Sequence, residues 1–326
     1  MNSILENLLK RMISASDQRL VVPFYHKVSD AKQSFEKDLY IPRKVIDFKN
    51  DITVLSTFYN PISMQEFIEI SKLKEKPKKN YFHITFDDGL SNFYKIVAPI
   101  LLEKKIPATV FVNSDFVDNK ALFYRYKASL LYQVYEKSSK KEKTKFYDFF
   151  EEDKAIREKL FAINFNNKEV LDSLANEIKF SFDEYLQTEK PYLSSAQIEE
   201  LIAMGFTIGA HSKSHPLYSD ISFEAQINQT KECVDWLVKK FHLDYKVFSF
   251  PFTDLEVSKE FFTTLMNEKV IEASFGTSGI KKDKFDTNFQ RLFFEIGNEN
   301  AENYLLKEYF KYFLKIPFQK NTMPRN

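Results

Sequence analysis

The chain has 326 residues, of which 44% are hydrophobic and 16% aromatic, so it can bury a large core and is not a disordered protein. Its formal net charge is only +1, without a basic tail, which argues against nucleic acid as a partner. The single cysteine, Cys233, excludes an internal disulfide bond, and the six glycines form neither a Gly-x-Gly-x-x-Gly nor a Walker pattern for binding nucleotide phosphates.

The N-terminal residues favour a helix rather than a targeting segment. Residues 1–19 lack the long apolar core of a signal peptide, and no apolar run in the chain reaches the roughly 20 residues of a membrane span. The sequence therefore predicts a cytoplasmic protein. An apolar stripe at helical spacing comprises Ile4, Leu5, Leu8, Leu9, Met12 and Ile13. The stripe packs on the domain or forms a peripheral contact with a membrane surface, and both interpretations stay open.

The next segments predict a strand followed by a helix. Residues 20–28 favour a short strand that ends near His26. A helix is predicted to begin after Ser63, because Glu66 stands at the position that completes a capping box.

Residues 81–89 are the most informative stretch. Residues 81–86 are aromatic or β-branched apart from His83, and both faces carry bulky side chains, which indicates a buried parallel strand. Asp87, Asp88 and Gly89 follow at its C-terminal end. Adjacent carboxylates repel each other unless a positive charge lies nearby, and a divalent metal could supply that charge. The alternative is an ordinary turn that caps the next helix.

A helix over about 92–105 and a strand over 108–112 follow. Residues 120–192 then break the alternation, because they contain no glycine and show helical spacing of their aromatic residues. We interpret them as a helical insertion with a solvated charged face. If the insertion instead covers the substrate, the residues to examine are those at its start, Phe123 to Tyr126.

Two histidines follow the next predicted strand. A helix begins after Ser194, with Gln197 at the capping-box position, and ends at Gly205. Behind the strand at 206–208 stand His211 and His215, whose spacing lets both imidazoles reach one metal. Such a pair alone is a weak signal, but together with Asp87 and Asp88 it indicates a site of two histidines and one aspartate.

The rest of the chain continues the alternation. It predicts a helix over 223–241, strands over 247–252, 272–276 and 289–294, and a terminal helix over 304–318. Strands that alternate with helices indicate a parallel sheet.

Four segments resemble the polysaccharide deacetylase family (carbohydrate esterase family 4, the NodB homology domain). They are Thr85-Phe86-Asp87-Asp88-Gly89, His211-Ser212-Lys213-Ser214-His215, Pro107-Ala108-Thr109-Val110-Phe111-Val112 and Phe248-Ser249-Phe250-Pro251-Phe252. The resemblance spans roughly residues 20–295 and implies an α/β fold, a distorted (β/α)7-type barrel, here in a single domain over 1–326 with the helical insertion at about 120–192. Family members usually carry a late catalytic histidine, yet this chain has none after His242. Tyr25-His26 resembles the circularly permuted exopolysaccharide deacetylases, which place that histidine near the N-terminus.

The resemblance implies a metal-dependent hydrolase that removes N-acetyl groups from hexosamine units of a glycan. Asp88, His211 and His215 would hold Zn²⁺, or another divalent metal such as Co²⁺ or Ni²⁺. Asp87 would be the general base and His26 the general acid. The C-terminal ends of the predicted strands, where such barrels gather their chemistry, hold Asp87, Asp88, His211, Phe252 and His26. The alternatives are a catalytically silent carbohydrate-binding relative and a metal hydrolase of another acetyl ester or amide.

Substrate and oxyanion contacts are expected from the third motif. The resemblance implies that the backbone N–H of Phe252, beside Pro251, assists the oxyanion. Asp254 is expected to bind sugar hydroxyls or to cap a helix. The family's third-motif arginine is missing here, and Arg291 in a later strand could substitute for it. The family's late tryptophan motif is not recognisable, and the sequence does not name the glycan or the oligomeric state.

Overall fold

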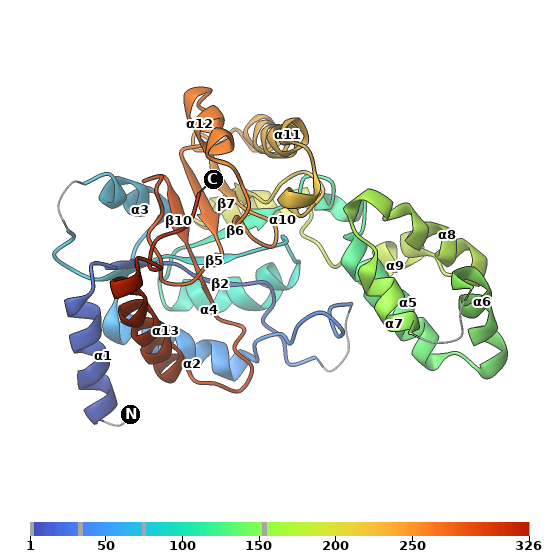
Figure 1. Cartoon of the computed structure of the whole chain (residues 1–326), viewed down its shortest axis with the longest axis horizontal. Coiled ribbons are helices and arrows are strands. Elements are labelled where there is room, and N and C mark those ends of the chain that lie inside the picture. The colour runs from blue at the N-terminus through green and yellow to red at the C-terminus, as the bar shows by residue number, and fades with distance from the viewer. Residues whose placement is uncertain (1–2, 32–34, 74–75, 152–154, 326) are drawn as a thin grey trace.

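An eight-stranded parallel sheet forms the centre of the molecule (Figure 1). The computed structural model describes residues 3–31, 35–73, 76–151 and 155–325. The strands lie in the order β10 (Asn288–Gln290), β9 (Ala273–Gly276), β8 (Val247–Ser249), β7 (Thr207–Ala210), β6 (Ala108–Val112), β5 (Ile84–Phe86), β2 (Pro23–Tyr25) and β11 (Leu292–Phe293). β10 and β11 belong to one segment, with Arg291 between them, so the two edges of the sheet meet there and the barrel is nearly closed. The expected distorted (β/α)7-type barrel is therefore confirmed.

A small parallel sheet extends the barrel at the N-terminal ends of its strands. It comprises β1 (Leu20–Val21), β4 (Tyr81–Phe82) and β3 (Asn60–Pro61), in that order. β4 continues into β5 through His83, whose buried ring contacts the carbonyl oxygen of Ile62 and the hydroxyl of Thr109, each at 2.8 Å. His83 therefore links the two sheets and lies away from the C-terminal ends of the barrel strands.

Helices follow most of the strands. They are α1 (Ser3–Ala15), α2 (Val45–Phe58), α3 (Met64–Ser71), the π-helix η1 (Phe93–Val97), α4 (Ala98–Glu103), α10 (Ser195–Ala203), α11 (Phe223–Phe241), α12 (Lys259–Asn267) and α13 (Ala301–Lys315). Short 3₁₀ turns are η2 (Val117–Asn119), η3 (Phe165–Asn167), η4 (Tyr218–Asp220) and η5 (Ile316–Phe318). The predicted capping boxes at Ser63 and Ser194 are both formed, which satisfies backbone N–H groups at these two helix starts.

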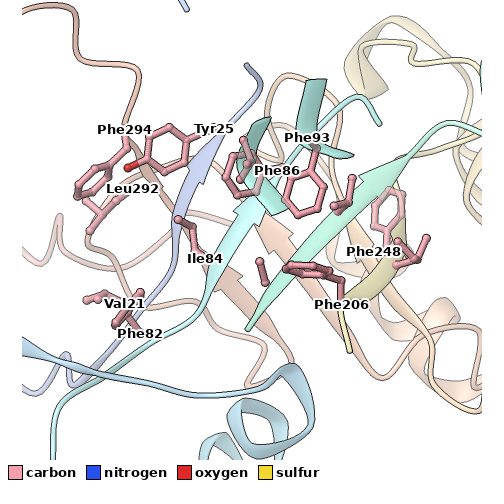
Figure 2. Close-up of a cluster of buried hydrophobic side chains, with 14 of the residues drawn as sticks. Val21, Tyr25, Phe82, Ile84, Phe86, Phe93, Phe206, Phe248, Leu292 and Phe294 are labelled. Atoms are coloured by element: carbon pink, nitrogen blue, oxygen red, sulfur yellow. The ribbon is translucent and has the colours of Figure 1, made fainter. Parts of the chain in front are cut away.

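The alternation of side chains along β4 and β5 separates the packing core from the site. Phe82, Ile84 and Phe86 belong to the main hydrophobic cluster, and Figure 2 shows them beside side chains such as Tyr25, Phe93 and Phe206. The residues between them have the opposite orientation, because successive side chains of a strand point to opposite faces. Thr85 and Asp87 accordingly contact Arg291 inside the barrel. The outward face thus carries the packing and the inward face carries the polar groups.

The expected insertion is a group of helices beside the barrel (Figure 1). They are α5 (Tyr124–Lys137), α6 (Lys140–Phe150), α7 (Ile156–Ala162), α8 (Glu169–Ile178) and α9 (Phe182–Glu189), while residues 152–154 of the predicted range lie outside the described residues. These helices share a hydrophobic cluster of their own. The chain that returns from them binds the loop after β5, since the N–H of Leu193 donates to the Gly89 carbonyl at 2.9 Å. The insertion therefore joins the barrel beside Asp87 and Asp88.

The N-terminal helix packs against the C-terminal one. α1 and α13 lie side by side in Figure 1, and Leu9 and Ile13 of α1 are buried in the main cluster. Leu8, on the same helix, stays 47% exposed. Packing on the domain thus accounts for only part of the apolar stripe. Among the described helices, none combines the length and hydrophobicity that a membrane span requires.

Candidate metal centre and active site

A cavity of about 410 Å³ opens at the C-terminal ends of the barrel strands. Its lining combines titratable and aromatic side chains from both ends of the sequence: Phe24, His26, Leu39, Tyr40, Asp87, Asp88, Phe123, Arg125, Tyr126, His211, His215, Phe252, Thr277 and Phe293. Asp87 and Asp88 follow β5, His211 follows β7, and His26 follows β2. Strand ends that are far apart in the sequence therefore meet at one site, as parallel barrels allow.

Asp88, His211 and His215 converge in this cavity. Their ligand atoms all lie within 4.8 Å of one another, and all three side chains are buried. Asp88 Oδ1 lies 3.5 Å from His211 Nε2 and 3.1 Å from His215 Nε2. This is the arrangement in which one carboxylate oxygen and two imidazole nitrogens can bind a single divalent ion.

The chemistry of these atoms fits a metal. Asp88 Oδ1 is buried without a hydrogen-bond partner among the described residues, although a buried carboxylate oxygen normally has one. His211 Nδ1 lies 2.9 Å from the Ser249 carbonyl oxygen, so Nδ1 carries the proton and Nε2 keeps a free lone pair. Burial lowers the pKa of His211 to about 4, so its ring is neutral at pH 7, the form that binds metals.

Asp87 is paired with Arg291 rather than aimed at the two histidines. The two nitrogens Nη1 and Nη2 of Arg291 donate to Oδ1 and Oδ2 of Asp87 at 2.8 and 2.7 Å, a bidentate ion pair. Arg291 also donates to the Gly276 carbonyl and lies over the Phe24 ring, 4.3 Å from its centroid. Burial alone would raise the pKa of Asp87, but Arg291, together with His211 and His26, holds this pKa below its ordinary value. Asp87 is therefore ionised at neutral pH.

His26 has a carboxylate partner that the sequence analysis did not identify. Nδ1 of His26 lies 2.6 Å from Oε2 of Glu295, and Oε1 of Glu295 accepts the backbone N–H of Lys27 at 2.7 Å. Burial would lower the pKa of His26, but Glu295, with smaller contributions from Asp88 and Asp87, raises it to about 9. Nε2 is thus the nitrogen left to donate a proton. Glu295 stands two residues after β11, which pairs with β2, the strand that precedes His26. Its position just after a strand was the one feature of the sequence that could have indicated Glu295.

The insertion contributes a tyrosine to the candidate metal centre. The hydroxyl of Tyr126, in the first turn of α5, donates to Asp88 Oδ2 at 2.6 Å and lies 3.1 Å from the hydroxyl of Tyr40. Tyr126 is 1% exposed, so this hydrogen bond is shielded from water. It orients the carboxylate so that Oδ1 faces the two histidines. Asp88 therefore has one oxygen held by the protein and one left for a metal.

Of the third-motif residues, only Phe252 lines the cavity. Its ring lies 4.8 Å from that of His215, and its N–H has no hydrogen-bond acceptor among the residues that the structure describes. Pro251 is buried behind it and accepts the N–H of Thr253 at 2.7 Å. Pro251 thus shapes the turn without reaching the cavity.

Asp254 does not reach the cavity either. Its carboxylate is 0% exposed, pairs with Arg325 and accepts hydrogen bonds from Asn288 and Gln290 at 2.9 and 2.6 Å. Asn288 and Gln290 lie on the face of β10 opposite to Arg291, because side chains alternate along a strand. The expected contact of Asp254 with sugar hydroxyls therefore has no geometric support, and Asp254 instead anchors the C-terminal segment.

Several loop residues of the site adopt the left-handed backbone region that glycine normally occupies. They are Asp88 (φ 69°), Ser212 (φ 66°), His215 (φ 58°) and Phe252 (φ 57°). Each such residue costs of the order of 1–3 kcal/mol and persists only where the surroundings enforce it. Their concentration around one cavity singles it out as the functional site.

The fold of the chain is shared with solved structures of other proteins. No curated protein matches the chain. Its fold is similar to that of a deacetylase, PplD, from Streptococcus pyogenes in complex with acetate, with 14% identity, a TM-score of 0.58, and coverage of 89% of this chain and 97% of that one. It is also similar to IcaB from Ammonifex degensii, with 13% identity, a TM-score of 0.56, and coverage of 90% and 97%. At such identities these structures establish the fold alone.

The family follows from the sequence match. The family model described as polysaccharide deacetylase matches residues 74–262, which is more than half of the 326 residues. The matched range holds Asp87, Asp88, His211 and His215, whereas His26 and Glu295 lie outside it and are brought in by the pairing of β2 with β11. The chain belongs to the polysaccharide deacetylase family.

Proposed function

We propose that this protein is a metal-dependent hydrolase that removes N-acetyl groups from hexosamine units of a glycan and releases acetate. The observation that carries the proposal is the meeting of Asp88, His211 and His215 with Asp87 and His26 in one cavity. The family and fold support deacetylation in general. The acetate found with the Streptococcus pyogenes deacetylase is the product that the proposal predicts here.

Asp88, His211 and His215 would hold the metal, which we propose to be Zn²⁺, or Co²⁺ or Ni²⁺ in its place. When bound, such an ion supplies a Lewis acid that polarises the acetamide carbonyl and lowers the pKa of water. The neutral ring of His211 and the unpartnered Oδ1 of Asp88 support this assignment.

Asp87 would act as the general base. Its carboxylate lines the cavity, is kept ionised by Arg291, and can accept the proton that water loses when it attacks the acetamide carbon. Arg291 would fix the orientation of that carboxylate through its two parallel hydrogen bonds. Arg291 thus takes the place of the arginine that the third motif lacks.

His26 would act as the general acid. An amide nitrogen must be protonated as it leaves, because an amide anion is a very poor leaving group. His26 is held by Glu295 at Nδ1, and its raised pKa keeps Nε2 protonated at neutral pH. The N–H of Phe252 would donate to the oxyanion that forms on the carbonyl carbon.

The test is acetate release from N-acetylglucosamine oligomers by the zinc-loaded protein, compared with an O-acetylated sugar. We expect release from the oligomers, and a loss of roughly 10²- to 10⁴-fold in Asp87→Asn, since that is the usual contribution of a general base. Metal content and melting temperature of the variant check that only the base has changed. Release from the O-acetylated sugar alone would indicate an esterase, and release from neither by a metal-loaded protein would leave a silent binder.

A further inference from the structure

Arg125 is a cation at the active-site cavity that the proposed mechanism does not use. It stands in the first turn of α5, where the helical insertion leaves the barrel, and it lines the same cavity as Asp87, His26 and His215. Its guanidinium carbon lies 5.7 Å from the ring centroids of both Tyr124 and Phe252. The side chain is thus held between aromatic rings and presented to the cavity.

Arg125 has no anionic partner among the described residues. Its one hydrogen bond to protein backbone runs from Nη1 to the Phe161 carbonyl at 3.4 Å, a long contact, and no ion pair joins it to a carboxylate of the described residues. Nε is buried without an acceptor. An arginine carries five N–H donors in a planar fork, so most of its hydrogen-bonding capacity remains available.

The carboxylates around the cavity already have positive partners. Asp87 is paired with Arg291, and Glu295 with His26. A divalent ion held by Asp88 as its single carboxylate would leave one positive charge at the metal. Arg125 adds a second positive charge, so the cavity favours a ligand with a negative charge.

We propose that Arg125 binds an anionic group, a phosphate or a carboxylate, that the glycan carries next to the acetylated sugar. The inference rests on the proposed function and specifies its substrate class as an acidic glycan. Arginine matches both anions, because its planar fork can form two parallel hydrogen bonds with either. The ring of Phe252 contacts both residues: its centroid lies 5.7 Å from the guanidinium carbon of Arg125 and 4.8 Å from the ring centroid of His215. The anion would therefore lie beside the reacting acetamido group and not on it.

The experiment compares three oligosaccharides with the zinc-loaded protein. They are a neutral N-acetylglucosamine pentamer, the same pentamer carrying a phosphate monoester, and an oligomer that alternates N-acetylglucosamine with glucuronic acid. We expect an anionic oligomer to have the lower KM. Arg125→Ala should reduce the preference for the anionic over the neutral oligomer by roughly 10- to 100-fold, as expected for a hydrogen bond to a charged group. Arg125→Lys should retain part of the preference for the anionic oligomer.

Arg157→Ala is the matched control. Arg157 belongs to the same insertion and stacks on Phe161, 4.8 Å from its ring centroid, but it does not line the cavity. We expect this variant to keep the preference. Which of the two anionic oligomers loses its advantage in Arg125→Ala identifies the anion as phosphate or carboxylate.

Two results would overturn the proposal. One is an equal KM of the unmodified protein for neutral and anionic oligomers. The other is a loss in Arg125→Ala that is the same for all three, mainly in kcat, which would place Arg125 at the reacting group. Calorimetry with the same oligomers separates this inference from the function on which it rests. If the protein binds the anionic oligomers more tightly than the neutral one, and this preference depends on Arg125, but no acetate is released, the deacetylase function is refuted and the anion site stands.

Discussion

Replacing Arg291 by methionine tests the ion pair at the centre of the site. Arg291 is 0% exposed and Asp87 is 2% exposed, so the substitution leaves a buried carboxylate without its counter-charge. Removing one partner of a buried pair usually costs about 3–5 kcal/mol of unfolding free energy. Methionine keeps an unbranched apolar stem over the Phe24 ring, so we attribute the loss to the charge and to the hydrogen bonds with Thr85 and Gly276.

The loss of unfolding free energy in Arg291→Met should increase with pH. In the unmodified protein Arg291 depresses the pKa of Asp87, so the stability that this pair adds is present above the unfolded-state pKa near 4 and is lost as the pH falls below it. In Arg291→Met burial raises the pKa of Asp87 instead, so the variant loses stability as the pH rises above about 4. The difference between the two proteins should therefore be larger at pH 8 than at pH 5.

Urea unfolding of metal-free protein at both pH values measures these effects. Asp87→Asn and the double variant complete the cycle, and the double variant should cost at least about 1 kcal/mol less than the sum of the single variants, because the residues are in contact. Arg157→Met serves as the exposed-arginine control. A cost below about 1 kcal/mol for Arg291→Met, or strictly additive single variants, would refute the reasoning.

Two further predictions concern the supporting residues. Glu295→Gln removes the main contribution that raises the pKa of His26. The alkaline limb of the pH profile of kcat/KM for acetate release should therefore move to lower pH by roughly one to three units. An unchanged alkaline limb would contradict the role of His26 as the general acid. Tyr126→Phe removes the hydrogen bond to Asp88 Oδ2, so zinc affinity, measured by competition with a chelating dye, should fall by roughly 10- to 100-fold while the helices of the insertion keep their circular dichroism. An unchanged zinc affinity would show that the hydrogen bond from Tyr126 does not contribute to metal binding by Asp88.

Much of the site was visible in local sequence patterns. Asp87, Asp88, His211 and His215 each follow a stretch with strong strand character, and parallel strands bring such positions together at one end of a barrel. Their proximity therefore depends on strand periodicity and chain direction, which the sequence encodes locally. The parallel direction of the eight strands follows from the alternation of strands with helices.

The supporting contacts were harder to predict because their partners are far apart in the sequence. Arg291 was considered as a substitute for the missing arginine, but its pairing with Asp87 spans 204 positions and depends on which face of β10 and β11 points inward. Glu295 was missed for the same reason. Tyr126 lies in the first turn of a helix whose composition is typical of ordinary packing, so only the geometry reveals its contact with Asp88.

Asp254 shows how the same limitation produces a wrong expectation. Its position after the third motif suggested a place at the mouth of the barrel. Arg325 and Asp283, from the C-terminal segment and the chain before β10, instead form a buried cluster with it. A partner 71 positions away decided its role, and no local pattern marks that partner.

Metal content of the purified protein is the measurement on which the proposed mechanism depends most. We expect one divalent ion per chain in the unmodified protein after zinc is supplied, and its loss in both Asp88→Ala and His211→Ala. His242→Asn is the control, because His242 ends α11 outside the cavity and asparagine tolerates its left-handed backbone. A protein that binds no metal, or variants that retain it, would contradict the metal-dependent mechanism and leave only the fold of the family.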